Sequence, residues 1–248
     1  MATTPTTAVP ATNVGSSPST ARINAVHHLA VNTADMKAQL EFFTDVLGAE
    51  LVGLFWMHGV PDGKHAFLRL NDHCSMSFVD LPANHEVGAE IGVTHAGTGA
   101  GPSAPGTMQH LAFNVDTVDE LLAVRDRIRS RGVNVMGHID HGMCHSIYFA
   151  GPEGLTLEVA TSSEGIDAEA WIDPEVVGTY DISSEELARM KAPAHYEGEG
   201  GAVAQPPVDP DKPHMAYPPE DYEKVIGTPD DIILQFASFP DPPVKVGD

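Results

Sequence analysis

The sequence predicts an α+β fold in which one β-α-β-β-β module occurs twice and an irregular extension follows. The first observation is a repeat: His28–Asn32 (HLAVN) and His110–Asn114 (HLAFN) match at an offset of 82 residues, with four identities in five positions. The second is that a helical pattern and strand-like segments follow each copy. The third is a change of character near residue 161, where prolines become frequent in this 248-residue chain.

The first module is expected to cover residues 23–82. Val26–Asn32 should be a short strand. Asp35–Leu47 has apolar residues three or four positions apart, which is the spacing of one helix face, and Gly48 is a natural stop. Three strands should follow, separated by turns at residues 61–63 and 71–72: Glu50–Met57, Lys64–Leu70 and Cys74–Leu81.

A Gly-rich linker, residues 83–107, separates the modules and is interpreted as a long connection or a loop over a pocket. The second module, residues 108–161, should begin with a strand at Met108–Val115. Thr117 and Glu120 form a capping-box pattern for a helix that runs to about Arg131. A strand at Val133–Gly137 and a hairpin should complete it, with arms at 144–150 and 155–161 around a Gly151–Gly154 turn.

The charge is strongly acidic: 35 Asp and Glu against 13 Lys and Arg give a formal charge of -22. Such a field repels phosphate backbones and anionic lipids, so we expect neither nucleic acid nor a membrane as a partner. No apolar run reaches the roughly 18 residues of a membrane span. Cys74 and Cys144 are far apart and show no metal-knuckle spacing, which fits a reducing cytoplasm.

Both ends of the chain differ from the modules. Residues 1–22 are rich in Thr, Ala, Pro and Ser without the apolar centre of a secretory signal, so a disordered arm is expected. Residues 161–248 carry 19 acidic and 5 basic residues. We expect the Pro-rich extension, 162–248, to contain short helices near Ser183–Lys191 and Tyr222–Ile226 and otherwise to wrap the outside of the domain.

Three residues suggest a metal site. Glu158 lies on the last strand between two apolar residues, where a carboxylate is costly unless it is paired, although an edge-strand Glu facing water is the alternative. His28 and His110 occupy equivalent places in the two repeats, and His27 competes with His28. Two imidazoles and one carboxylate leave coordination positions open, which suits non-haem Fe(II) or Mn(II) better than a structural zinc ion.

Several motifs resemble the vicinal oxygen chelate superfamily: VHHLAV, DVLGAELV, MQHLAFNV and DHG-x-C-x-SIYF-x-GPEG-x-x-LE. That group includes glyoxalase I, methylmalonyl-CoA epimerase, fosfomycin-resistance thiol transferases and extradiol ring-cleaving dioxygenases. The resemblance covers residues 23–161. It implies that the modules form a cupped, incompletely closed mixed β-sheet around a divalent metal, held by His28, His110 and Glu158.

One departure from the pattern narrows the activity. Glyoxalase I and the epimerase take a fourth ligand from the last strand of the first module, where the matching residue here is Ser77, a poor ligand. The three-ligand members remain, and the scarcity of basic residues disfavours the phosphonate-binding transferases. The resemblance therefore implies Fe(II) as the cofactor, with Mn(II), Zn(II) and Ni(II) as alternatives.

Two further residues are candidates for catalysis. Tyr148 lies ten residues before Glu158 and can face the same side of the hairpin. Its spacing resembles that of a dioxygenase tyrosine that orients substrate and stabilises an oxyanion, although packing in the sheet would explain it equally well. His141 is the candidate acid–base group, and His138 and His145 compete with it.

These residues together indicate an extradiol-type dioxygenase that cleaves a catechol-like aromatic diol with O2. The alternative is a lyase, isomerase or thiol transferase on the same metal scaffold. A third reading is a non-enzymatic member that sequesters a ligand between two subunits. The expected partners are a small-molecule substrate, O2 and a second copy of the chain in a homodimer.

Overall fold

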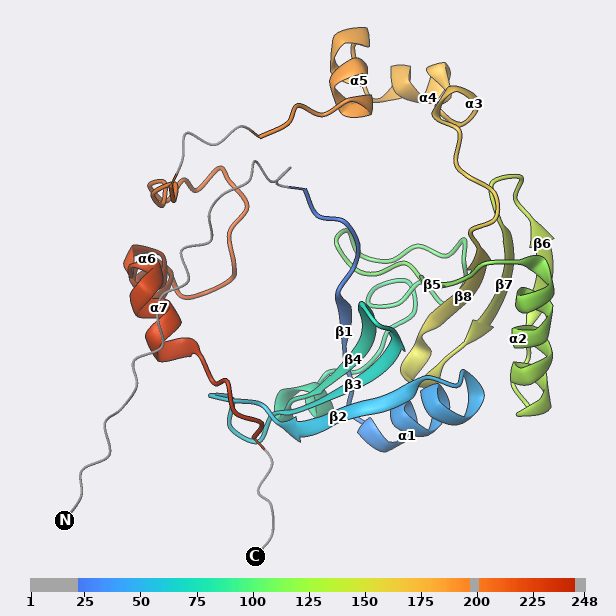
Figure 1. Ribbon diagram of the computed structural model, residues 1–248, viewed down its shortest axis with the longest axis horizontal. Helices are drawn as coiled ribbons and strands as arrows, with labels where there is room; N and C mark the ends of the chain where they lie inside the picture. The colour runs from blue at the N-terminus through green and yellow to red at the C-terminus, as the bar shows by residue number, and fades with distance from the viewer. Residues whose placement is uncertain (1–21, 197–200, 244–248) are drawn as a thin grey trace, which may run out of the picture. The chain divides into compact units, whose positions relative to one another are not determined.

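The computed structural model describes residues 22–196 and 201–243 (Figure 1). These residues divide into two compact units. The larger unit consists of residues 25–180 and 239–243, and it contains both predicted modules. The smaller consists of residues 22–24 and the described part of 181–238. The expected N-terminal arm lies almost wholly outside the described residues.

The first module forms one four-stranded mixed sheet in the order β1-β4-β3-β2. Its strands are β1 (His28–Asn32), β2 (Glu50–Trp56), β3 (Lys64–Asn71) and β4 (Cys74–Asp80). β1 is parallel to β4, and the other pairs are antiparallel. The helix between β1 and β2 starts as α1 (Met36–Glu41), which Asp35 caps, and ends in a π-helical turn, η1 (Phe42–Val46).

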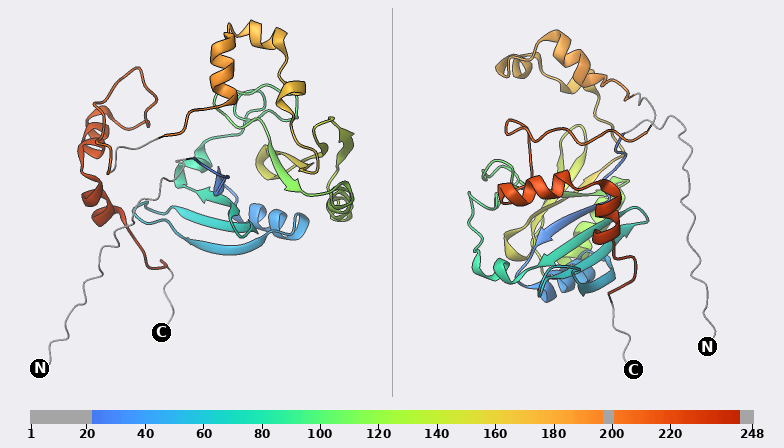
Figure 2. Two further views of the ribbon diagram at one scale, coloured as in Figure 1. Left: turned by 45° about the horizontal axis from the view of Figure 1, so that its top comes forward. Right: turned by 90° about the vertical axis from the view of Figure 1, so that its left-hand side faces the viewer.

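The second module repeats this topology in the order β5-β8-β7-β6. Its elements are β5 (Leu111–Val115), α2 (Val118–Ser130), β6 (Met136–Asp140), β7 (His145–Ala150), a short 3-10 turn η3 (Pro152–Gly154) and β8 (Thr156–Thr161). Thr117 and Glu120 form the predicted capping box at the start of α2. Figure 2 shows the two open sheets, with a helix against each. The predicted α+β fold of paired modules is confirmed.

The predicted strand at Val133–Gly137 was placed too early. The Val133 amide donates to the Ile128 carbonyl, and the Val135 carbonyl accepts from Arg129. These residues therefore close the end of α2 instead of pairing in the sheet, and β6 starts at Met136. β5 also starts later than predicted, at Leu111.

One hydrophobic core serves both modules. Phe43, at the end of the first helix, packs edge-on against Phe78 of β4 and Phe113 of β5, with ring centroids 4.9 and 6.1 Å apart. Leu29 and Leu111 face the same core. Because side chains alternate along a strand, the neighbouring His28 lies on the face of its sheet turned away from the core.

Two sets of polar contacts, which we call clasps, join the modules, one at each end of the helix between β1 and β2. In the first, Glu153 of the η3 turn accepts hydrogen bonds from the Thr33 hydroxyl at 2.5 Å, the Ala34 amide at 2.7 Å and the Gln39 side chain at 2.7 Å. Glu153 adopts a left-handed backbone conformation, with φ at 55°. A carboxylate is thus held beside the first turn of α1, where free amide groups favour a negative charge.

The second clasp lies at the other end of the same helix. The Arg127 guanidinium, from α2, donates to the carbonyl oxygens of Val46 and Asp45, each at 2.9 Å. A Cβ atom at position 48 would lie only 3.0 Å from the carbon of the guanidinium group. The glycine found there therefore leaves room for the Arg127 side chain. The positive charge stabilises the carbonyl groups left unpaired where this helix ends.

The linker between the modules begins with a 3-10 helix, η2 (Pro82–Glu86), and continues as a structured loop. We call residues 90–107 the wall loop. Backbone hydrogen bonds close it on itself, from Gly92 to His95 and from Ala104 to Val93, and Ala96 is buried. A Cβ at Gly99 would lie 3.4 Å from the Tyr148 ring, so the loop packs against the second sheet.

The extension is more helical than expected. It contains α3 (Ala168–Trp171), α4 (Pro174–Thr179), α5 (Ser184–Lys191), α6 (Pro219–Gly227) and α7 (Asp230–Ala237). The two expected short helices correspond to α5 and α6, and Ser183 is the residue that caps α5. In the described part of the chain, every helix is too short or too polar to cross a bilayer. That the extension wraps the domain stays a prediction.

Candidate functional site

The buried carboxylate of Glu158 is paired with an imidazole. Glu158 lies on β8, directly opposite Ala112 of β5 and Tyr148 of β7, and only 5% of it is exposed. The His110 Nε2 atom lies 2.8 Å from the Glu158 Oε2 atom. Two of the three predicted metal ligands therefore meet at one point on the sheet face that is turned away from the core.

His28 has other neighbours in this structure. It is exposed on β1, where its Nδ1 atom lies 2.9 Å from the Nδ1 atom of His27. Its ring packs edge-on against Phe67, with centroids 5.5 Å apart. Across the residues that the structure describes, no three His, Cys, Asp or Glu side chains are grouped so as to hold one ion. The metal-ligand roles stay a prediction.

The paired residues fit a divalent metal chemically. The His110 nitrogen and the Glu158 oxygen are donors of the types that such ions accept, and an ion can displace a proton shared between them. Ser77 offers no further ligand, because its fully buried hydroxyl donates to the Leu29 carbonyl at 3.3 Å. The donor set with His28 would therefore number three and leave coordination positions open.

Tyr148 lies beside this pair, as the hairpin register requires. Burial raises the pKa of its phenol, and the charge of the Glu158 carboxylate and a hydrogen bond to it add to the effect. The Tyr148 hydroxyl lies 3.1 Å from the Nε2 atom of His141. Its ring centroid is 6.2 Å from that of His110, in an edge-on arrangement. Tyr148 thus adjoins both His110 and Glu158, and His141 adjoins Tyr148.

The two competing histidines contact each other. The His138 Nε2 atom lies 2.8 Å from the His145 Nδ1 atom. The His145 Nε2 atom also lies 3.9 Å from the Glu164 Oε1 atom. In β7, His145 is an odd number of positions from Tyr148, so its side chain points to the opposite face. Of the three candidates, His141 is the one that contacts Tyr148.

Sequence reasoning missed two neighbours of the site. His65 packs between Phe55 and Phe67 on the His28 side of the first sheet. Burial lowers the pKa of His65, and the charge of His28 lowers it further. Because side chains alternate between the two faces along β3, the sequence could have indicated that His65 lies on the same face as His28. Gln109, which contacts His110, had no signal of its own.

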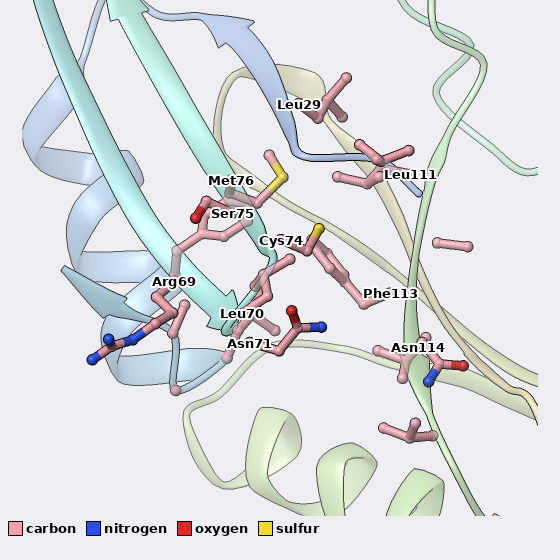
Figure 3. Close-up of a pocket in the computed structure, with 18 of the residues that line it drawn as sticks. Leu29, Arg69, Leu70, Asn71, Cys74, Ser75, Met76, Leu111, Phe113 and Asn114 are labelled. Carbon is pink, nitrogen blue, oxygen red and sulfur yellow. The ribbon is translucent and has the colours of Figure 1, made fainter. Parts of the chain in front are cut away.

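A separate cavity of about 420 Å³ lies between the two modules (Figure 3). Its walls come from β1, the β3–β4 turn, β5 and the end of the first helix. They are mostly apolar, with side chains such as Leu29, Met76, Leu111 and Phe113. None of His28, His110, Tyr148 or Glu158 lines it. The candidate site is therefore a different region from this cavity.

Comparison with known proteins gives a family and several relatives. The model of the Glyoxalase/Bleomycin resistance protein/Dioxygenase superfamily matches residues 25–159. Biphenyl-2,3-diol 1,2-dioxygenase 2 of Rhodococcus globerulus is 26% identical over 154 residues, which cover 61% of this chain and 71% of that protein. An iron-dependent extradiol dioxygenase of Rhodococcus jostii (strain RHA1) is 26% identical over 160 residues, 60% of this chain and 46% of the relative.

A third relative, 2,2',3-trihydroxybiphenyl dioxygenase of Sphingomonas paucimobilis, is 28% identical over 173 residues, 68% of this chain and 50% of that protein. The chain thus spans about half the length of the second and third relatives. Among solved structures, a lactoylglutathione lyase of Agrobacterium tumefaciens is 20% identical with a TM-score of 0.40, over 57% of this chain and 96% of the other. Since the family model matches more than half of the sequence, the chain belongs to the Glyoxalase/Bleomycin resistance protein/Dioxygenase superfamily.

Proposed function

We propose that the protein is a metal-dependent extradiol-type dioxygenase, which cleaves a catechol-like aromatic diol with O2. The observation that carries the proposal is the adjacency of two pairs on one sheet face, His110 with Glu158 and Tyr148 with His141. The names of the three relatives support the same reaction class. The first two relatives suggest biphenyl-2,3-diol as a substrate to test and iron as the metal to test.

His28, His110 and Glu158 would hold the metal, which in this proposal is Fe(II). When bound, it would supply a Lewis acid that orients the diol oxygens beside O2. Mn(II), Zn(II) and Ni(II) are the alternatives. His28 contacts His27 in this structure, so it would have to leave that contact to join the pair.

The other residues orient the substrate and move protons. Tyr148 stays protonated at neutral pH, since a tyrosine pKa is about 10 and burial raises it further, so its hydroxyl can donate a hydrogen bond to a substrate oxygen. His141 shares that hydroxyl and can take a proton from the diol and return one later. The wall loop, through Gly99, covers one side of the Tyr148 ring and limits access of water there.

The position of Ser77 favours this reaction over a lyase or isomerase of the same superfamily. Its hydroxyl is buried and already engaged with a backbone carbonyl, so it cannot serve as the fourth ligand that the resemblance assigns to those enzymes. A three-ligand site leaves room for both diol oxygens and O2.

The test is anaerobic loading with Fe(II), followed by a panel of catechols with and without O2. Consumption of O2 and a product that has gained two oxygen atoms, both absent in His110→Ala, are expected. Turnover that survives without O2 would replace the proposal with a lyase, isomerase or thiol transferase. Ligand binding without turnover, unchanged in His110→Ala, would replace it with a ligand-sequestering role.

In this proposal the protein forms a homodimer, lies in the cytoplasm and binds neither nucleic acid nor membrane. Acidic composition supports the last two points, since a charge of -22 repels polyanions. Light scattering of the purified chain measures the oligomeric state directly. A mass equal to one chain, 26.3 kDa, would reject the dimer.

A further inference from the structure

The side-chain amide of Gln109 joins two parts of the site. Its nitrogen donates to the carbonyl oxygens of Thr98 at 3.0 Å and Gly101 at 3.1 Å, both in the wall loop. Its oxygen accepts from the Nδ1 atom of His110. Because a carbonyl oxygen can only accept, the two loop contacts fix which end of the amide is the nitrogen. The oxygen is therefore the end that faces the imidazole.

The backbone explains how two consecutive side chains can meet. In a strand, Gln109 and His110 would point to opposite faces. Sheet pairing begins only at Leu111, so residues 109 and 110 lie outside the strand and are free of this alternation. The late start of β5 is thus what allows the Gln109 oxygen to reach the His110 ring.

The contact to Nδ1 decides which nitrogen of His110 faces the site. With Nδ1 donating to Gln109, Nε2 is left toward Glu158 at 2.8 Å. A partner on the far ring nitrogen orients a ligating imidazole and sets its tautomer. The same amide holds Thr98 and Gly101, and Gly99 between them packs on the Tyr148 ring.

We infer that Gln109 is a positioning residue that sets the orientation of His110 and fixes the wall loop against Tyr148 at the same time. The inference deepens the proposed function and rests on it for the metal role of His110. Its consequence is coupling: a change in the wall loop reaches His110 through the Gln109 carboxamide.

Two substitutions at position 109 separate the two contacts. Gln109→Glu keeps an oxygen that can accept from His110 but loses both donors to the loop. Gln109→Leu loses all three hydrogen bonds at similar size. Thr107→Val is the matched control, because it removes a wall-loop hydrogen bond, from the Thr107 hydroxyl to the Ala104 carbonyl at 2.7 Å, that does not involve His110.

Two readouts use the metal-free protein: amide hydrogen exchange of residues 98–101, and the His110 ring tautomer from long-range 15N NMR. Gln109→Leu should speed the exchange about 10-fold, as expected for a lost hydrogen bond or two, and lower the Nδ1–H population. Gln109→Glu should speed the exchange but keep Nδ1–H. Thr107→Val should leave the His110 signal unchanged. Circular dichroism checks that each variant folds.

The third readout is metal affinity. Gln109→Leu should weaken it roughly 10–100-fold, and Gln109→Glu should not weaken it. If Gln109→Leu changes neither the exchange nor the tautomer, the positioning role is wrong, whatever the metal affinity. If the wild-type protein binds no divalent metal, the proposed function fails instead, and that result is read from the wild type alone.

Discussion

Tyr148 and Glu158 face each other across β7 and β8, on the side of the sheet that is turned away from the core. Burial and the Glu158 carboxylate together raise the pKa of the Tyr148 phenol. The phenol is therefore a hydrogen-bond donor throughout the neutral range. Its hydroxyl lies 3.1 Å from the His141 Nε2 atom, and in the proposed reaction the two side chains exchange a proton.

The Tyr148→Phe substitution keeps the ring against Gly99 and removes only the hydroxyl. We expect kcat for catechol cleavage to fall about 100-fold, the lower end of what acid–base groups contribute, while metal content stays the same. Steady-state kinetics with metal analysis measures both. Tyr180→Phe, at an exposed position, is the control. Wild-type kcat in Tyr148→Phe would show that the hydroxyl takes no part.

The three histidines near the hairpin give a matched comparison. His141→Asn removes the group that contacts Tyr148, whereas His138→Asn removes one that contacts His145 on the other face. We expect a loss of kcat of about 100-fold or more in the first variant and little change in the second. Equal losses in both variants would contradict the assignment.

The modular fold was predictable because its signals are local and occur twice. Alternation, the Thr117–Glu120 capping box and the HLAVN/HLAFN repeat each act within a few residues, so the sequence displays them directly. The same holds for the placement of Tyr148 opposite Glu158, which follows from the hairpin register.

The contacts between distant segments were not predictable. GPEG reads as a turn, but nothing local indicates that Glu153 reaches Gln39, 114 positions away in the sequence. Gln109 can contact the neighbouring His110 because sheet pairing begins only at Leu111. The contact between His141 and Tyr148 likewise depends on the path of the loop before β7. Each of these depends on tertiary packing, which overrides local pattern.

The Glu153 clasp predicts a pH-dependent contribution to stability. Burial alone would raise the pKa of Glu153, but hydrogen bonds from Thr33, Gln39 and the Ala34 amide outweigh it, and the pKa is lowered. A carboxylate with a lowered pKa stabilises the fold above its unfolded-state pKa of about 4.3, and the effect is lost as the pH falls through the folded-state value.

Glu153→Gln should therefore lower the free energy of unfolding at pH 7. We expect about 0.5–1 kcal/mol, a small value because the side chain remains in contact with solvent. The difference from wild type should shrink as the pH falls below about 4. Urea unfolding at several pH values measures it. Glu41→Gln, which breaks only an exposed pair with Lys37, should have little effect. A difference that persists unchanged at low pH would contradict the account.

The second clasp makes a prediction about stability alone. Arg127→Ala removes the hydrogen bonds to the carbonyl groups of Val46 and Asp45 and leaves them without a charged partner. We expect a loss of about 1–2 kcal/mol, the range for hydrogen bonds to a charged group near a helix end. Arg125→Ala, which breaks an ion pair with its neighbour Asp126, is the control. Equal midpoints of thermal unfolding in the two variants would contradict a stabilising role for the Arg127 hydrogen bonds.

The central claim is that His28, His110 and Glu158 share one metal ion, and the metal content of anaerobically loaded protein tests it most directly. Fe(II) should bind at one ion per chain in the wild type and be lost in His28→Ala, His110→Ala and Glu158→Gln. His27→Ala should retain it, because His27 is only a neighbour of the ligand. Wild-type protein without bound metal, or full loading of His28→Ala, would contradict the claim.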